Sequence, residues 1–448
     1  DLDRRGYLKE AEQCLEIMVH YQGTVPLPGD FETPFGVLYG SNGYESGGYN
    51  RGQGWAMWGM AEHYRYTRDR AWLERVAPAL IKACDWITHE RRRTMLLGPG
   101  GERPIDYGFL PAGSLEDVTD YWHWLSSNAY ASWGFTAIAE VLADIGHPEA
   151  GRLQQEAAAF RSDLMAGFNE SQARSPVVKL ADGRYVPYYP PRLERRGRDF
   201  GWLREVLEGS MGLLVSELVP WHDPAARWIV EDYEDNLYTS ERYGYANSIP
   251  DYERYWFSRG GFSMQSNLLL HPAVYLRRDD VKPFLRTFFN GFASTYYPET
   301  CMCAEHALPT LADARGDHFK ASDEANVTHY LRLLLIEEHG DSLLLGKAIP
   351  REWLQHGKEV RVERALTYFG PMGYALRSHA DEAYIEAEVE LPTRNAPAGA
   401  SLRLRHPRQE VLRRVEIDGE AWTQFDPASE TITLPVKAGL MKVRAWYC

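Results

Sequence analysis

Carboxylate side chains stand beside aromatic rings in two stretches of this sequence. The first, SLEDVTDYWHWLSSNAY (114–130), places Asp117 and Asp120 next to a Tyr-Trp pair. The second, YYPETCMCAEHALPTLADARGDHFKASDEAN (296–326), contains Glu305. Two carboxyl groups, one protonated and one ionised, hydrolyse a glycosidic bond with inversion when they stand about 6.5–9.5 Å apart with water between them. The two stretches therefore indicate acid–base chemistry on a sugar.

The acids Glu116, Asp117 and Asp120 have two interpretations. Acids in the first turn of a helix cap it and complement its dipole, which accounts for at least one of the three. Apolar rings beside a carboxyl group favour its protonated form, as a proton donor at neutral pH requires. We therefore expect Asp120 or Asp117 to be the proton donor. Acids within helices, such as Glu234, are more often ion-paired than catalytic.

Glu305 is the strongest candidate for the carboxylate that activates water. It lies outside any helical pattern and precedes His306, which can orient it. Asp323 and Glu324, by contrast, follow Ser322 in a pattern typical of a capped helix start, so we expect their role to be structural.

Further stretches carry side chains suited to holding a sugar. Arg and Gln offer several hydrogen-bond donors in a rigid arrangement, and an aromatic face packs well against a sugar ring. The expected substrate-binding residues are Glu45, Arg51, Gln53, Trp55, Trp122, Tyr255, Trp256, Arg259 and His306. A salt bridge within a loop is an equally good interpretation of Glu45.

The elements that would position these residues are helices, up to about residue 339. Apolar periodicity predicts helices over 6–20, 51–68, 70–91, 121–145, 148–168, 202–217, 223–238, 262–277, 279–295 and 323–338. The connections alternate between tight turns and long segments rich in Gly, Pro, Tyr and acids. Loops this long inside a compact domain are usually functional. Such alternation is typical of helical hairpins stacked in a ring, an α/α toroid in which the long loops gather at one face.

Five hairpins can be counted, one fewer than an (α/α)6 toroid requires. We expect the first hairpin, or a further domain, to lie upstream of Asp1; a five-hairpin toroid or an unrecognised pair is the alternative. From residue 340 on, period-two segments such as KEVRVERAL and AYIEAEVELP predict an antiparallel β-sandwich of seven or eight strands. The expected organisation is a mainly α protein, with a toroid at 1–339 and a β-sandwich at 340–448.

Composition and charge argue against several classes of partner. The formal net charge of −14 disfavours nucleic acids and anionic membranes. No run of about 18 apolar residues is present, so no membrane-spanning helix is expected. The five cysteines, an odd number, form no visible disulfide framework. The expected partner is an oligosaccharide or glycoside.

Helical hairpins followed by a C-terminal β-sandwich resemble the six-hairpin glycosidases, which include α-L-rhamnosidases and glucoamylase-like enzymes. The segment IDGEAWTQFDPASETITLP (417–435) looks like the tails of those enzymes. The stretch YNRGQGWAMWGMAEHYRYTRD (49–69) is similar to a helix of unsaturated glucuronyl hydrolases whose Arg, Gln and Trp line the sugar site. The resemblance implies that Arg51, Gln53 and Trp55 face a sugar, and that two loops before inner helices supply the acids.

A metal is the alternative at the second acidic stretch. Glu299-x-Cys301-x-Cys303 resembles part of the zinc site of β-L-arabinofuranosidases that use a Cys nucleophile. Zinc takes about four ligands, so a closed site would need a further group such as His306. That family also has an adjacent pair of cysteines, which this sequence lacks. The expectation is therefore no metal and no cofactor.

The expected function is that of an inverting, exo-acting glycoside hydrolase. The first alternative is an unsaturated uronyl hydrolase or a polysaccharide lyase on the same toroid. A lyase needs a base and a cation, which Tyr255 or His306 and Arg259 can supply. The second alternative is a non-catalytic, glycan-binding toroid.

Overall fold

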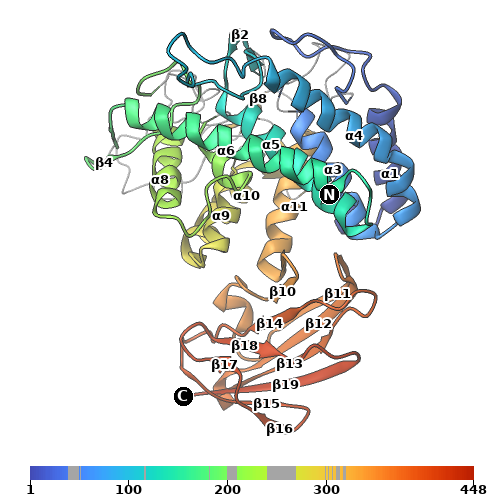
Figure 1. The fold of residues 1–448 in the computed structure, drawn as a ribbon. Helices are drawn as coiled ribbons and strands as arrows, with labels where there is room; N and C mark the ends of the chain where they lie inside the picture. Colours follow the sequence, from blue (N-terminus) through green and yellow to red (C-terminus); the bar gives the residue numbers. More distant parts are fainter. Residues whose placement is uncertain are drawn as a thin grey trace.

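The computed structural model of this chain has a helical N-terminal part and a sheet-rich C-terminal part (Figure 1). It describes residues 1–38, 50, 52–115, 118–180, 182–198, 209–239, 269–297, 299–300, 302–304, 306–308, 313–315 and 319–448. The helices are η1 (Asp3–Arg5), α1 (Leu8–His20), α3 (Gly52–Thr67), α4 (Arg70–Arg92), α5 (Leu125–Asp144), α6 (Ala150–Arg174), α7 (Met211–Val215), α8 (Pro224–Thr239), α9 (His271–Arg277), α10 (Val281–Thr295) and α11 (Ala321–Leu335). None of the helices in these ranges is long and apolar enough to cross a membrane.

Short antiparallel ribbons lie among the helices. They pair β1 (Gly113–Leu115) with β2 (Val118–Trp122), β3 (Val178–Lys179) with β4 (Tyr185–Val186), β5 (Tyr296–Tyr297) with β6 (Met302–Cys303), and β7 (His306–Leu308) with β8 (Asp313–Arg315). The predicted helices each overlap an observed α-helix, but two of them include residues that belong to strands. Residues 121–122 belong to β2 and residues 336–338 to a strand, because each segment pairs with a neighbouring strand that helical periodicity does not reveal.

Helices α3 and α5 lie in parallel, with their backbones in close approach. A Cβ atom on Gly54 would fall 2.1 Å from the carbonyl oxygen of Tyr130, and one on Gly134 would fall 2.4 Å from that of Gly54. Only glycine fits at such a contact. Further along both helices, Tyr64 Oη donates a hydrogen bond to Asp144 Oδ2 at 2.8 Å. Residue numbers rise in the same direction on both helices, so the two start at the same end.

The helices contact one another in a closed order. Helix α5 packs on α3, α6 and α7; α7 packs on α8 and α9; α9 packs on α10 and α11. The N-terminal η1 contacts α3. Its Arg4 donates to Tyr66 Oη of α3 at 3.0 Å and also contacts His329 of α11. The N-terminal segment therefore joins α3 to α11.

The N-terminal ends of α3, α5 and α11 point away from the C-terminal sheets (Figure 1). At the other end of α3, Arg394 of the sheet region donates to Tyr66 O at 2.7 Å. Tyr368 Oη lies 2.8 Å from both carboxylate oxygens of Glu62 there. Helix α5 is parallel to α3, and α11 runs directly from Leu335 into the first strand of the sheets. The segments that precede these three helices therefore lie far from the sheets.

Two sheets in the C-terminal part share one apolar core. Their strand orders are β17-β18-β14-β10-β9 and β11-β12-β13-β19-β15-β16. Leu343 and Leu402 from the first sheet are buried in the same cluster as Ile385 and Val443 from the second. The strands are β9 (Ile336–His339), β10 (Ser342–Leu345), β11 (Glu359–Thr367), β12 (Gly370–His379), β13 (Tyr384–Glu390), β14 (Gly399–Arg403), β15 (Leu412–Ile417), β16 (Glu420–Trp422), β17 (Phe425–Asp426), β18 (Thr431–Leu434) and β19 (Leu440–Tyr447).

The predicted period-two segments are all strands, but two details of the prediction are wrong. Residues 340–448, which the structure describes throughout, form ten strands rather than seven or eight, and a further strand, β9, precedes them. The additional strands β9, β16 and β17 are too short or too polar to show a period. In addition, β10 pairs with β14 in parallel, so the sheets are not wholly antiparallel. Strand direction depends on how the connections cross, which alternation does not encode.

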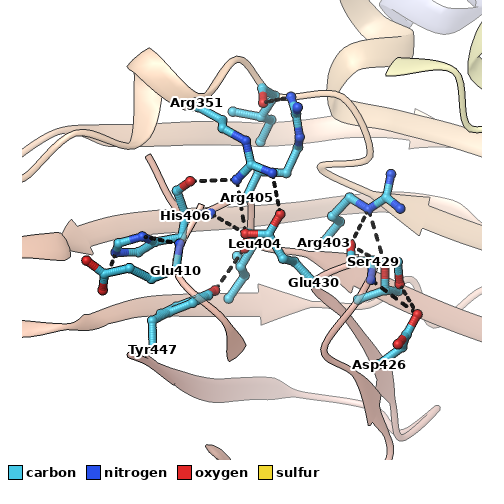
Figure 2. Close-up of polar contacts among 12 residues, drawn as sticks. Arg351, Arg403, Leu404, Arg405, His406, Glu410, Asp426, Ser429, Glu430 and Tyr447 are labelled. Carbon is cyan, nitrogen blue, oxygen red and sulfur yellow. Dashed lines mark hydrogen bonds and ion pairs between the residues drawn. The ribbon is translucent and has the colours of Figure 1, made fainter. Parts of the chain in front are cut away.

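Charged side chains stabilise the sheets and join them to the helical part. Arg403 donates two hydrogen bonds to the carboxylate of Asp279, in the turn before α10, at 2.6 and 2.7 Å. Figure 2 shows the adjoining cluster, in which Arg351 binds both carboxylate oxygens of Glu430 at 3.0 and 2.6 Å. The backbone N–H of His406 donates to the same carboxylate at 2.7 Å. Such bidentate pairs fix orientation as well as distance.

Candidate active site

Asp120 lies in a β-hairpin directly before α5. Gly113 of β1 stands opposite Trp122 of β2. Helix α5 begins only at Leu125, so Asp120 is not in a first helical turn and does not cap this helix. Asp120 is exposed. Because successive side chains of a strand point to opposite faces, Asp120 and Trp122 share one face of the hairpin.

The hairpin is anchored to the segment that precedes α3. Asn50 Nδ2 donates hydrogen bonds to Ser114 O at 2.9 Å and to Pro28 O at 3.1 Å. A Cβ atom on Gly113 would fall 2.1 Å from this nitrogen, so a larger residue there would displace the Asn50 side chain. The connections that precede α3 and α5 are therefore in direct contact.

A third connection, which follows α6, pairs with the residues between the hairpin and α5. Leu125 N donates to Pro191 O at 2.8 Å, and Leu193 N donates to His123 O at 3.2 Å. This pairing brings Glu194 to His123, whose Nδ1 lies 2.6 Å from Glu194 Oε1. The three long connections therefore meet around the start of α5.

His123 stands between two carboxylates. Its Nε2 lies 3.8 Å from Asp106 Oδ2, on the side of the ring opposite Glu194. Burial acts to raise the pKa of Glu194, but the hydrogen bond and charge of His123 outweigh it and hold that pKa below its ordinary value. Glu194 is therefore an ionised group. Sequence reasoning missed these residues because 71 positions separate His123 from Glu194 and no local spacing links them.

The ring of Trp122 carries a guanidinium group. Arg192 Cζ lies 4.3 Å from the centroid of Trp122 and 5.6 Å from that of Trp124. A cation placed over an aromatic face in this way is attracted by the ring quadrupole. Arg192 therefore covers one face of Trp122, which was predicted to bind substrate.

Trp55 lies in a cluster of four rings on α3 and α5. Its centroid is 5.2 Å from those of Tyr130 and Trp133. Trp58 stacks on Trp133 at 4.6 Å. The three indole rings are half-buried, so aromatic surface remains accessible on these two helices.

Gln53 has a role different from the predicted one. Its Oε1 accepts a hydrogen bond from Leu38 N at 2.9 Å, and its Nε2 donates to Gly36 O at 3.2 Å. The side chain is buried. Its amide therefore ties the segment before α3 to the helix, and the prediction that it binds substrate is corrected to a structural role.

The structure fixes the chain on both sides of Glu305. Strand β6 ends at Cys303 and β7 begins at His306. Cys303 N donates to Glu324 Oε1 at 3.4 Å, and Lys320 N donates to Cys303 O at 3.1 Å. These bonds hold β6 on the first turn of α11. Glu305 itself lies outside the described residues.

The first turn of α11 differs in one detail from the expected capped start. The helix begins at Ala321, so Ser322 lies within it, and its hydroxyl bonds to Asp323 Oδ2 at 3.3 Å. Asp323 is fully buried. Glu324 supports β6, which is the structural role expected of it, although through a different contact.

The possible zinc ligands are only partly described. Glu299 is exposed and Cys303 is buried. The part of the chain that the structure describes contains no group of three or more His, Cys, Asp or Glu side chains placed to hold a metal ion. Several predicted site residues lie outside that part and remain predictions: Glu45, Arg51, Asp117, Tyr255, Trp256, Arg259, Cys301, Glu305 and the side chain of His306.

No protein-family model and no curated protein matches this chain. Solved glycosidases align with it at low sequence identity. An α-L-rhamnosidase from Dictyoglumus thermophilum is 10% identical, with a TM-score of 0.49, over 89% of this chain. An α-mannosidase from Streptococcus pneumoniae, of a family described as metal-independent, is 11% identical with a TM-score of 0.42, over 64% of this chain and 68% of its own. A GH127 β-L-arabinofuranosidase from Geobacillus stearothermophilus T6 is 12% identical with a TM-score of 0.39, over 96% of this chain and 67% of its own.

This chain spans 40% of the length of the rhamnosidase. These three structures are glycosidases, the class that the sequence was expected to resemble.

Proposed function

We propose that the chain is a glycoside hydrolase with its active site at the N-terminal ends of α3, α5 and α11. The observation that carries this proposal is the placement of the two acidic stretches at one end of the helical part. The hairpin with Asp120 precedes α5, and the strands that flank Glu305 precede α11. An acid and a base must flank one glycosidic bond, so both must come from the same end of the molecule.

In this proposal Asp120 or Asp117 protonates the departing oxygen and Glu305 activates water. The exposure of Asp120, on the same face as Trp122, supports a role in contact with substrate. Glu324 and Glu194, two other acids near the starts of α11 and α5, are less suited to proton transfer. Glu324 accepts a hydrogen bond from a backbone N–H, and the interaction with His123 keeps Glu194 ionised. The reaction would be inverting and exo-acting.

The same proposal takes residues 1–339 as an α/α toroid and residues 340–448 as a β-sandwich domain. The closed order of helix contacts supports a ring of helices, and the core shared by two sheets supports a sandwich. A ring gathers the loops that precede its inner helices at one end. That is where the described connections before α3 and α5 meet.

Replacing each acid by its amide tests the proposal. We expect Glu305→Gln, and one of Asp120→Asn and Asp117→Asn, to lose about 10²–10⁴-fold in kcat on a panel of aryl glycosides and oligosaccharides. The matched control is Glu140→Gln, because Glu140 pairs with Arg65 at the opposite end of α5. NMR of the freshly released sugar gives its anomeric form, and inversion is expected. Full activity in Glu305→Gln would remove the assignment of the base.

The same assays separate the alternatives. A product with a new ultraviolet-absorbing double bond identifies a lyase, with Tyr255, Arg259 and His306 as the residues to replace next. Loss of ultraviolet absorbance from an unsaturated uronide identifies an uronyl hydrolase. Glycan binding without turnover of any substrate identifies a non-catalytic protein.

A further inference from the structure

Glu90, in the last turn of α4, is a fully buried acid at an unfavourable place in its helix. The C-terminal end of a helix carries a partial negative charge, which disfavours a carboxylate there. Burying a charged group also costs free energy unless the group is paired and hydrogen-bonded. Neither the helix nor its packing therefore explains Glu90, and the explanation must lie in the groups that its carboxylate binds.

The carboxylate of Glu90 holds part of the connection that precedes α3. It accepts hydrogen bonds from Glu32 N at 3.0 Å and from Thr33 N at 3.1 Å. Arg93 Nη1 donates to Glu90 Oε2 at 2.7 Å and to Asp30 O at 2.6 Å. Hydrogen bonds to a carboxylate are shorter and stronger than those between neutral groups. The end of α4 therefore holds three backbone groups of this connection in place.

The segment 28–33 of that connection also pairs with the hairpin that carries the proposed acid. Asp30 N donates to Ala112 O at 2.8 Å. Gly29 stands opposite Gly113 of β1 in an antiparallel bridge, and β1 pairs with β2 on its other edge. A ribbon of two strands is marginally stable by itself. The segment 28–33 therefore acts as a third strand, which connects the hairpin to α4.

We propose that Glu90 is a positioning residue of the proposed active site, which sets the place of Asp120 by fixing the segment 28–33 to α4. Glu90 acts through the backbone of this segment and then through β1, because its own side chain is buried away from any substrate. A displacement of about 1 Å at a reacting group can lower the rate about a hundredfold. This inference rests on the proposed function, and its test includes a measurement that needs no substrate.

Hydrogen–deuterium exchange in Glu90→Gln measures whether the hairpin is released. The substitution keeps the shape of the side chain, but it replaces one acceptor oxygen by an NH₂ group that faces Arg93. We expect the backbone N–H groups of Asp30 and Ser114, which join the segment to the hairpin, to exchange about tenfold faster than in the wild type.

Glu430→Gln is the matched control, because Glu430 is also a buried carboxylate with an arginine partner and a backbone N–H donor (Figure 2). It lies in the sheet region, away from the hairpin. A general loss of stability affects both variants alike, whereas a loss of positioning affects Glu90→Gln alone. Arg93→Gln removes a donor from both Glu90 and Asp30 and carries the same expectation if Glu90→Gln does not fold.

Kinetics on the best substrate of the glycoside panel give the second readout. We expect Glu90→Gln to lower kcat about tenfold to a hundredfold while KM changes far less, and Glu430→Gln to leave both at wild-type values. Unchanged exchange in Glu90→Gln, or faster exchange with unchanged kcat, overturns the positioning role. Absence of glycoside turnover by the wild type overturns the proposed function, and exchange alone then decides whether Glu90 fixes the hairpin.

Discussion

Glu234 of α8 is a largely buried acid. Its hydrogen bond and ion pairs explain why it is buried, so no catalytic role is needed. Tyr275 Oη donates to its Oε1 at 2.8 Å, Arg286 pairs with the same oxygen, and His271 Nε2 lies 3.4 Å away. Burial acts to raise the pKa of Glu234, but these three contacts outweigh it and lower that pKa to about 2. The expectation that Glu234 is ion-paired is therefore confirmed, and its carboxylate ties α8 to α9 and α10.

Glu234 stabilises the fold only while it is ionised. Its folded pKa of about 2 lies below the ordinary value of 4.5. The stabilisation is therefore complete above about pH 4.5 and is lost as the pH falls toward 2. We expect Glu234→Gln to lower the free energy of unfolding at neutral pH by about 1–3 kcal/mol. As the pH is lowered, this free energy is expected to decrease less in the variant than in the wild type. Urea titrations at a series of pH values measure both effects, with Glu140→Gln as the exposed control. A wild-type pH dependence in Glu234→Gln would contradict this account.

At the scale of elements, the close contact of α3 and α5 brings the connections before these helices together. Gly54 has no room for a methyl group beside the backbone of Tyr130, whereas a Cβ on Gly59 of the same helix would meet only Leu15 Cδ2, at 3.7 Å. The two glycines therefore differ in function although both lie within α3. Gly54 permits the helix contact, and Gly59 only lowers helix propensity.

The two glycines predict opposite effects of alanine. We expect Gly54→Ala to destabilise the protein by about 1–3 kcal/mol, because the helices must move apart. Gly59→Ala is expected to stabilise it by up to about 1 kcal/mol, because alanine favours the helix and meets no clash. Chemical denaturation of both variants measures the free energies. Equal effects at the two positions would show that the helix contact does not depend on Gly54.

At the scale of the whole molecule, the sheets attach to the end of the helical part opposite the candidate site. Tyr368 places its hydroxyl against Glu62 of α3, and Arg403 binds Asp279 before α10. These contacts stabilise the helical part from the end that carries none of the proposed catalytic groups. Changes there should affect stability rather than the chemistry.

Tyr368→Phe tests whether the junction with the sheets affects stability alone. The substitution removes the hydroxyl that binds the buried carboxylate of Glu62, and we expect a loss of about 1–3 kcal/mol in the free energy of unfolding. On the substrate identified above, kcat and KM are expected to stay at wild-type values at temperatures where the variant is folded. Tyr7→Phe is the control, because Tyr7 is exposed. A large change in kcat or KM in folded Tyr368→Phe would show that the junction acts on the site.

The sequence predicted part of the candidate site. Asp120 and Trp122 were singled out because an acid stands beside rings in a long connection, and both lie on the hairpin before α5. Gln53 belongs to a motif of sugar-binding helices, but here backbone groups at Gly36 and Leu38 engage its amide. His123 and Glu194 were not singled out, because neither stands in a pattern that marks it locally.

The sequence alone determined the helices and most strands, because their apolar periods and turn residues are local properties of the chain. It also determined the presence of acidic, aromatic connections between the helices. Only the tertiary structure decided which connections meet and which polar groups are already engaged. Asp120, expected directly before a helix, proved to lie in a β-hairpin, and pairing between segments 71 positions apart brought Glu194 to His123. Such partners are chosen by packing and backbone hydrogen bonding across the fold, and the order of the residues along the chain does not encode them in any short window.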